Sequence, residues 1–122
     1  MKFYICKRCG NIVAAVKESG APISCCGQNM VELEAGTTDA AVEKHVPVVE
    51  VKDGIVTVTV GSVAHPMAPE HYIEWIALST DKGNQRKTLQ PGDEPKACFA
   101  ICEGETVTAA YAYCNLHSLW KS

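Results

Sequence analysis

Four of the seven cysteines lie within the first 26 residues, and this crowding constrains the N-terminal fold more than any other feature. Two residues separate Cys6 from Cys9, and a glycine follows, so two thiolates can bind one ion above a tight turn. After fifteen further residues come the adjacent Cys25 and Cys26. Residues 1–36 are too few to bury a sufficient hydrophobic core. A bound metal is therefore expected to supply the missing stability.

The spacing leaves the identity of this metal open. Four thiolates in a tetrahedron suit either iron or zinc. A zinc ribbon normally has two residues between the cysteines of its second pair, whereas Cys25 and Cys26 are adjacent and must bend the angles at the metal. A structural zinc site and a vicinal disulfide are the alternatives, and the strained geometry of such a disulfide argues against it.

The composition predicts a single domain, with or without a small appendage, in a reducing compartment. An odd number of cysteines favours metal binding or catalysis in the cytoplasm over disulfides. The chain begins without a long apolar segment, so no signal peptide is expected, and no apolar run is long enough to cross a membrane. A net charge of −3 without a Lys/Arg cluster argues against a nucleic-acid partner.

From Pro47 onward the sequence predicts short strands separated by Pro, Gly and Asp turns. Asp53-Gly54 is a hairpin signal between VVEVK and IVTVTV, and valine and threonine alternate in the second of these strands. Further strands are predicted in HYIEWIALST, QRKTL, KACFAIC and TVTAAYAYC. Six or seven such strands without a long amphipathic helix are typical of an antiparallel β-sandwich of immunoglobulin-like type. The preceding connection, EAGTTDAAVEKH, has room for a short helical turn.

All four histidines lie in the C-terminal two-thirds of the chain, at or near the loops expected at the ends of a sandwich. His45 precedes the first predicted strand, His65 and His71 flank the stiff loop PMAPE, and His117 follows Cys114 at the end of the last predicted strand. A single histidine in a β protein is more often hydrogen-bonded or exposed than a metal ligand. Taken together, these residues predict a second metal site, and imidazoles with one thiolate suit iron.

Two cysteines, Cys98 and Cys102, fit neither site. They share one strand face with Ala100 and are predicted to be small buried hydrophobic residues. Residues four apart on an extended strand are about 13 Å apart, which is too far for a disulfide. Four further residues are interpreted as packing residues rather than cofactor contacts: Met30, Met67, Trp75 and Trp120.

Six segments, in order along nearly the whole chain, resemble desulfoferrodoxin, the two-iron form of superoxide reductase: CKRCGNIV, CCGQNM, EKHVPVVE, GSVAHPMAPEHYIEWI, LQPGDEP and YCNLHSLWK. The resemblance implies a rubredoxin- or desulforedoxin-like four-cysteine iron domain over residues 1–36. It implies a neelaredoxin-like superoxide reductase domain, an immunoglobulin-like sandwich, over residues 37–122. The first iron would be held by Cys6, Cys9, Cys25 and Cys26, with zinc able to take its place. A second, catalytic iron would have four equatorial imidazoles and one axial thiolate: His45, His65, His71, His117 and Cys114.

The reaction implied by the resemblance is the one-electron reduction of superoxide to hydrogen peroxide without release of dioxygen. Five protein ligands leave one open position for a small anion, and neutral imidazoles leave the ferrous centre positive. The thiolate donates electron density to the iron, as in thiolate-ligated haem enzymes. Lys44 is implied to steer superoxide and help its protonation, and Glu43 to occupy the sixth position of the oxidised iron. A homodimer is also implied, with rubredoxin or a pyridine-nucleotide-dependent reductase as electron donor.

Two other functions compete with this interpretation. The chain could be an electron carrier whose four-cysteine iron is the working centre, or a non-enzymatic module for metal sensing or scaffolding. A five-ligand iron with an open face argues against both. Without its flanking motif, the dipeptide Glu43-Lys44 would be interpreted as a solvated charge pair on a loop.

Overall fold

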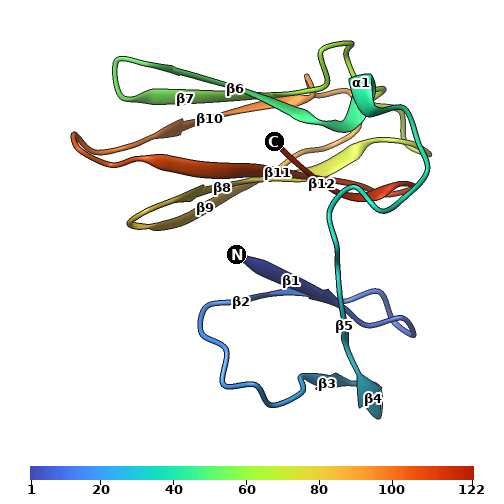
Figure 1. Ribbon diagram of the computed structural model, residues 1–122. Helices are drawn as coiled ribbons and strands as arrows, with labels where there is room; N and C mark the ends of the chain where they lie inside the picture. Colours follow the sequence, from blue (N-terminus) through green and yellow to red (C-terminus); the bar gives the residue numbers. More distant parts are fainter. The chain divides into compact units, whose positions relative to one another are not determined.

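The computed structural model describes every residue from Met1 to Ser122. The chain forms two compact units, Met1–Glu34 and Ala35–Ser122, and its regular structure is almost entirely β-strand (Figure 1). The predicted mainly-β fold class is therefore confirmed. None of the helical structure has the length and apolar character that crossing a bilayer requires.

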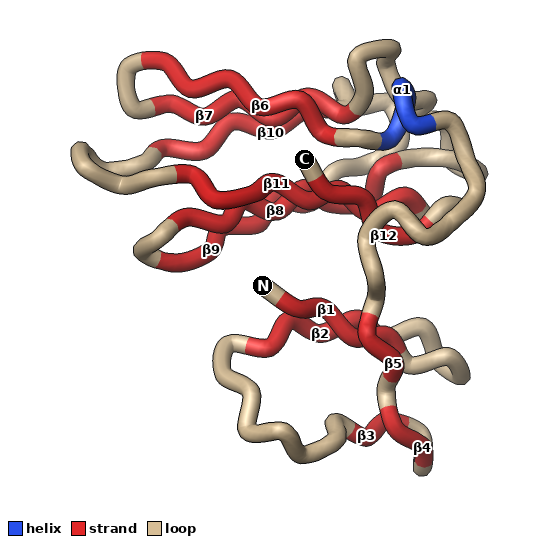
Figure 2. Tube along the Cα trace, in the orientation of Figure 1, coloured by secondary structure: helices blue, strands red, loops and turns tan.

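The first unit contains a three-stranded antiparallel sheet and a separate short hairpin (Figure 2). β1 (Lys2–Ile5) pairs with β2 (Ile12–Ala15) on one side and with β5 (Val31–Glu32) on the other. β3 (Ser24–Cys25) and β4 (Gln28–Asn29) form the hairpin. Its buried hydrophobic side chains are few: Phe3, Cys6 and Met30. Such a small core agrees with the expectation that a metal stabilises this unit.

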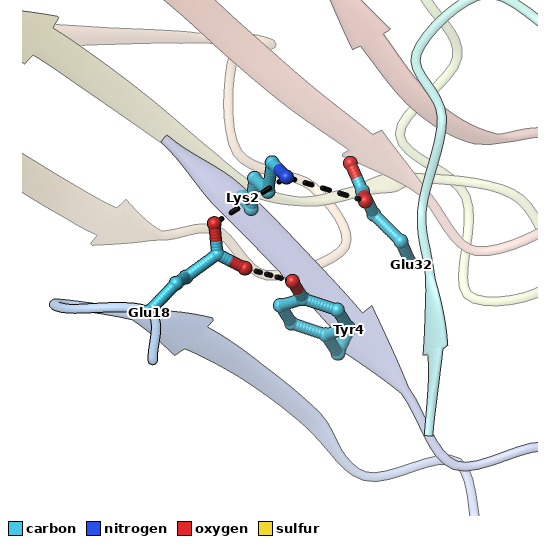
Figure 3. Close-up of polar contacts among 4 residues, drawn as sticks. All are labelled: Lys2, Tyr4, Glu18 and Glu32. Atoms are coloured by element: carbon cyan, nitrogen blue, oxygen red, sulfur yellow. Dashed lines mark hydrogen bonds and ion pairs between the residues drawn. The ribbon is translucent and has the colours of Figure 1, made fainter. Parts of the chain in front are cut away.

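Polar contacts tie the loop after β2 to the sheet (Figure 3). Lys2 Nζ lies 3.4 Å from a Glu18 carboxylate oxygen and 3.8 Å from one of Glu32. The Tyr4 hydroxyl donates a hydrogen bond to Glu18, and this bond is the main reason that the pKa of Tyr4 is raised to about 12. Exposed ion pairs of this kind contribute little stability. A bound metal is therefore still expected to contribute more than these contacts to the stability of the first unit.

The second unit is a sandwich of two antiparallel sheets (Figure 1). One sheet has the strand order β10-β7-β6 and the other β12-β11-β8-β9. The seven strands are β6 (Pro47–Lys52), β7 (Ile55–Val60), β8 (Ile73–Thr80), β9 (Gly83–Thr88), β10 (Lys96–Ala100), β11 (Val107–Cys114) and β12 (Ser118–Lys121). This arrangement confirms the predicted immunoglobulin-like sandwich.

The predicted hairpin joins β6 to β7. Its loop residues Asp53 and Gly54 have φ values of 51° and 76°, and a two-residue loop with two positive φ values matches the twist of the flanking strands. The valines of β7 are buried and the threonines are only partly so, as the alternation predicts. These valines belong to the core between the sheets, with Ile76, Leu78, Phe99, Ala110 and Ala112.

The prediction that Cys98 and Cys102 are buried is wrong, because both are exposed. Ala97 and Phe99 are the buried residues of β10, and Cys98 lies on the opposite face, with its sulfur 3.6 Å from the Thr57 hydroxyl oxygen. Buried and exposed residues alternate along β10 as predicted, but the buried side chains are on the face opposite to the predicted one. Small residues such as alanine and cysteine carry little information about which face of a strand is buried.

Candidate metal centres

Four sulfur atoms of the first unit lie within 4.8 Å of one another: those of Cys6, Cys9, Cys25 and Cys26. The sulfurs of Cys9 and Cys25 are 3.6 Å apart, and those of Cys25 and Cys26 are 3.9 Å apart. Metal–sulfur bonds of about 2.3 Å in a tetrahedron place the sulfurs about 3.8 Å apart. The four sulfurs therefore have the spacing that one tetrahedral ion needs, and none of them is in a disulfide.

Two tight turns bring these sulfurs together. After β1, the N–H of Gly10 donates to the carbonyl of Cys6 at 2.9 Å. Between β3 and β4, Cys26 and Gly27 have φ values of 53° and 73°, so they form a two-residue hairpin loop. Successive side chains of an extended strand point to opposite faces. The left-handed backbone at Cys26 is what allows the adjacent Cys25 and Cys26 to reach one point.

Hydrogen bonds within the cluster shift the pKa values of three of these thiols, one downward and two upward. The backbone N–H of Cys9 is the main reason that the pKa of Cys6 falls to about 6. The side chain of Cys9 is the main reason that the pKa of Cys26 rises to about 12 and that the pKa of Cys25 also rises. Thiolates this close repel one another, so all four ionise together only when a cation binds between them. Asn11 donates to two of the sulfurs, at 3.4 Å to Cys9 and 3.7 Å to Cys25.

In the second unit, four imidazole rings form a closed square. Neighbouring ring centroids are 4.6 Å apart for His45 and His65, 4.7 Å for His65 and His71, 5.1 Å for His71 and His117, and 4.9 Å for His117 and His45. The planes of neighbouring rings meet at 78° to 86°, and the diagonal from His45 to His71 is 6.3 Å. The rings therefore surround one point, as four ligands in a plane do.

The donor atoms of these rings approach one another closely. His45 Nε2 lies 3.1 Å from both His65 Nε2 and His117 Nδ1, and His117 Nδ1 lies 3.8 Å from Cys114 Sγ. Ligand bonds of about 2.1 Å at right angles place neighbouring nitrogens about 3.0 Å apart. His71 Nε2 is buried without a hydrogen-bond partner, which is costly unless a cation binds there. The spacing and this orphaned nitrogen show that the residues fit a bound metal ion.

Backbone carbonyls fix the orientation of two rings. The Nδ1 of His45 lies 2.7 Å from the Ala41 carbonyl, and the Nδ1 of His65 lies 2.7 Å from the Pro66 carbonyl. A carbonyl can only accept, so each Nδ1 carries the proton and each Nε2 is left with its lone pair for a metal. Burial lowers the pKa of His45, His71 and His65, the last to about 4. The rings are therefore held in the neutral form that binds metal.

Three segments that are distant in the sequence supply these ligand candidates. The helical turn α1 (Val42–His45) ends at the first, and the loop between β7 and β8 holds His65 and His71. β11 ends at Cys114, and the turn that follows it holds His117. In Figure 1 all three segments lie at the end of the sandwich opposite the β6–β7 hairpin. α1 confirms the helical turn expected before the first strand of the sandwich.

Comparison with known proteins agrees with this geometry. The family profile described as "Desulfoferrodoxin" matches residues 37–122, and that described as "Desulfoferrodoxin, N-terminal domain" matches residues 1–33. The chain belongs to the desulfoferrodoxin family.

Relatives of known name are similar over the full chain. A desulfoferrodoxin homolog of Archaeoglobus fulgidus is 51% identical over 122 residues, which cover 100% of this chain and 96% of that protein. The desulfoferrodoxin of Nitratidesulfovibrio vulgaris is 48% identical over 121 residues, which cover 99% and 94%. The crystal structure of the superoxide reductase from Treponema pallidum matches over 98% of both chains, with a TM-score of 0.83 and 41% identity. The resemblance to desulfoferrodoxin is thus confirmed, and the two clusters are consistent with its two iron centres.

In this member of the desulfoferrodoxin family, Asn115 links two of the ligand segments. Its Nδ2 donates to the Glu70 carbonyl at 3.1 Å, and its Oδ1 accepts from the Tyr72 N–H at 3.0 Å. Its own N–H donates to the Tyr72 carbonyl at 3.2 Å. These bonds lie on both sides of His71, whereas Asn115 itself follows Cys114. No sequence pattern predicts a role for this residue, and only its place between Cys114 and His117 could have indicated one.

Trp120 contacts the ring of one ligand candidate and the backbone of another. Its indole stacks on His45, and its Nε1 donates to the His117 carbonyl at 2.9 Å. It is buried, which agrees with its interpretation as a packing residue. Its contacts with two ligand candidates go beyond that interpretation.

Glu43 and Lys44 are exposed and lie in the helical turn directly before His45. They form no ion pair with each other. Burial is the main reason that the pKa values of His45 and His71 fall, and the positive charge of Lys44 lowers both further. At His45 the negative charge of Glu43 opposes this effect, so the charges of Glu43 and Lys44 are minor influences beside burial.

Proposed function

We propose that this chain is a superoxide reductase, an oxidoreductase that reduces superoxide by one electron to hydrogen peroxide. The observation that carries the proposal is the square of four imidazoles with the Cys114 sulfur beside it, in a member of the desulfoferrodoxin family. The Treponema pallidum protein, whose structure matches over 98% of both chains, is itself named a superoxide reductase.

Five residues would hold the catalytic iron. His45 and His65 would bind through Nε2, because each Nδ1 is committed to a backbone carbonyl. His71 would also bind through Nε2, its buried atom without a partner. His117 would bind through Nδ1, the nitrogen that faces His45, and Cys114 through its sulfur. With these five ligands, a bound iron would still be able to take a small anion.

When bound, ferrous iron supplies the electron that, with two protons, converts superoxide to hydrogen peroxide. The residues of the chain prepare the site for this reaction. Four neutral imidazoles leave most of the cation's charge uncompensated, so the site attracts an anion. Burial raises the pKa of the Cys114 thiol, so its thiolate forms only together with the cation. Electron density from this thiolate favours electron transfer toward the substrate and release of the product.

Lys44 Nζ is proposed to attract superoxide and to hold the water that delivers protons to it. Its exposed position before His45, and its electrostatic action on His45 and His71, support this role. The neighbouring Glu43 is proposed as a carboxylate that would bind the oxidised iron once the product has left. If the two were only a solvated charge pair, replacing either would leave the reaction unchanged.

The four-cysteine site is proposed to bind the other iron, with zinc able to replace it. Cys9 and Cys26 are exposed whereas Cys6 is buried, so an electron donor can approach one side of the cluster. Rubredoxin or a pyridine-nucleotide-dependent reductase is the proposed donor. We further propose that residues 1–36 and 37–122 are the two functional domains and that the chain works as a homodimer.

The proposal is tested by loading the protein with iron, reducing it without oxygen and mixing it with a pulse of superoxide. One peroxide per superoxide, without dioxygen, is expected. Half that yield, together with dioxygen, would identify a dismutase. If no peroxide forms, the chain is not a reductase and electron transfer is the function that remains. Cys114→Ser should abolish both the reaction and the thiolate-to-iron absorption of the oxidised protein. Cys98→Ser, which removes an exposed thiol outside both clusters, is the matched control and should change neither.

A further inference from the structure

Gly61, the residue after β7, lies directly against the backbone of α1. A Cβ atom placed on Gly61 would lie 2.7 Å from the Lys44 carbonyl oxygen, 2.8 Å from that of Glu43 and 2.3 Å from that of Val63. Contacts below 3.0 Å are essentially never seen for real Cβ atoms, and all three neighbours are backbone atoms that cannot swing away. The φ of 86° at this position also favours glycine.

Three hydrogen bonds join the same two segments. The N–H of Val63 donates to the Glu43 carbonyl at 2.9 Å, and the Ser62 hydroxyl donates to the same oxygen at 3.3 Å. The N–H of Gly61 donates to the Val46 carbonyl at 3.2 Å. We call residues 61–63 the brace, because their bonds reach the chain on both sides of Lys44 and His45.

α1 depends on the brace because a helical turn this short is not stable without contacts from the rest of the chain. It has four residues and no side-chain cap at its start. A single helical turn is unstable alone, and its unpaired carbonyls need partners from elsewhere. The brace supplies those partners and sets how far the turn lies from the sandwich.

We propose that Gly61 is a positioning residue for superoxide reduction, because its missing side chain lets the brace hold Lys44 beside the square of imidazoles. The inference rests on the proposed function, in which Lys44 acts on superoxide. A side chain at position 61 would push the Glu43–Lys44 backbone outward and carry the ammonium with it. The His45 ring is also held from outside this turn by the stacked indole of Trp120 in β12, so the metal ligands would stay in place.

Gly61→Ala tests this inference, with Gly104→Ala as its matched control. Gly104 has a φ of 83°, close to that of Gly61, but no atom within 4 Å of a Cβ placed there. The two substitutions therefore impose similar backbone strain, and only the first causes a collision. Gly61→Ala should lower the second-order rate constant for superoxide about tenfold and flatten its dependence on salt. The thiolate-to-iron absorption should stay, and Gly104→Ala should change neither property.

A double-mutant cycle with Lys44→Ala separates positioning from general damage. If Gly61 acts through Lys44, Gly61→Ala has no further effect on the rate constant once Lys44 is alanine. A second, independent tenfold loss in that background would overturn the inference. Loss of the thiolate-to-iron absorption in Gly61→Ala alone would also overturn it, because the substitution would then disturb the ligands themselves.

Hydrogen exchange gives a readout that does not depend on activity. In the zinc-loaded protein, Gly61→Ala should speed exchange at two amides, whereas Gly104→Ala should not. These are the N–H of Val63, which donates to the Glu43 carbonyl, and the N–H of Val46, which closes α1 by donating to the Val42 carbonyl at 3.0 Å. Unchanged exchange at both amides overturns the inference, even if activity falls. If the wild-type protein fails to reduce superoxide, the proposed function fails, and the exchange result still decides whether Gly61 holds this turn.

If Gly61→Ala does not fold, Ser62→Ala provides the second test. It removes one hydrogen bond to the Glu43 carbonyl and leaves the glycine in place. The rate constant should fall about twofold, and this fall should disappear in the Lys44→Ala background. An unchanged rate constant, or a fall that persists without Lys44, would refute the role of the brace.

Discussion

The indole of Trp120 stacks on the imidazole of His45, with ring centroids 4.8 Å apart and planes inclined by 30°. The same indole donates from Nε1 to the carbonyl of His117 at 2.9 Å. These histidines are neighbours in the square, so one side chain contacts two of its four members. An aromatic ring with a donor at its edge can do both, which phenylalanine cannot.

Trp120→Phe should keep the stacking on His45 and lose the hydrogen bond to His117. Groups that orient metal ligands in this way contribute about tenfold or more to metal affinity. We expect iron to dissociate about tenfold faster from the catalytic site, with a changed EPR spectrum of the oxidised protein. Trp75→Phe is the control, because Trp75 stacks on Tyr113, with ring centroids 5.5 Å apart. Equal iron loss from both variants would contradict the role given to Trp120.

Asn115 should matter through the two segments that its side chain connects. Asn115→Ala leaves the Tyr72 N–H and the Glu70 carbonyl without their partner, which costs about 1–3 kcal/mol when such groups are not solvated. Asn115→Asp keeps the acceptor for Tyr72 and should recover part of the loss. Urea unfolding of the zinc-loaded protein measures these differences. Asn84→Ala, at an exposed position on β9, is the control, and an equal effect there would contradict the prediction.

The sequence predicts most of the sandwich because its signals are local. Alternating valines and the Asp53-Gly54 turn act within a few residues. β12 has no such signal, since it begins at Ser118 with a φ of 64° and is held by pairing with β11 and by burial of Leu119 and Trp120. The outward face of Cys98 likewise depends on where the second sheet packs, which no local pattern encodes.

In the candidate site, too, some residues are predicted by local sequence signals and others are not. Cysteine and histidine are uncommon, and their spacing carries chemical meaning, so the ligand candidates could be named before their donor atoms were seen to converge. The roles of Asn115 and Gly61 could not be predicted, and Trp120 could be interpreted only as a packing residue. Their residue types have many roles in loops and strands, and their importance arises only from contacts between segments far apart in the sequence.

The metal-free protein should lose stability as the pH falls below about 6.5, the usual pKa of an unfolded histidine. Burial lowers the pKa of His65 to about 4 in the folded state. Between these values the unfolded chain binds more protons, so acid favours unfolding. His65→Asn should reduce this dependence. Urea unfolding of the second unit at pH 7.5, 5.5 and 4.5 measures it, and equal stability at all three would contradict the assigned burial effect.

Lys44→Ile should slow the reaction with superoxide by about tenfold or more at low salt, because one attracting charge is lost. Added salt should then matter less than it does for the wild-type protein. Lys52→Ile is the control, since Lys52 lies at the β6–β7 hairpin, away from the three ligand segments. Stopped-flow or pulse experiments over a range of salt concentrations give both rate constants. Equal slopes for the wild-type protein and Lys44→Ile would remove Lys44 from the mechanism.

Removing the metal from the four-cysteine site should unfold the first unit and leave the second folded. The first unit has few buried hydrophobic residues, whereas the second has a core between two sheets. Cys9→Ser should therefore abolish amide protection in β1 and β2 and preserve it in β7 and β8. Cys102→Ser, an exposed thiol outside both clusters, should preserve all four. Hydrogen exchange followed by NMR makes the comparison, and protected β1 and β2 amides in metal-free Cys9→Ser would show that this unit folds without its metal.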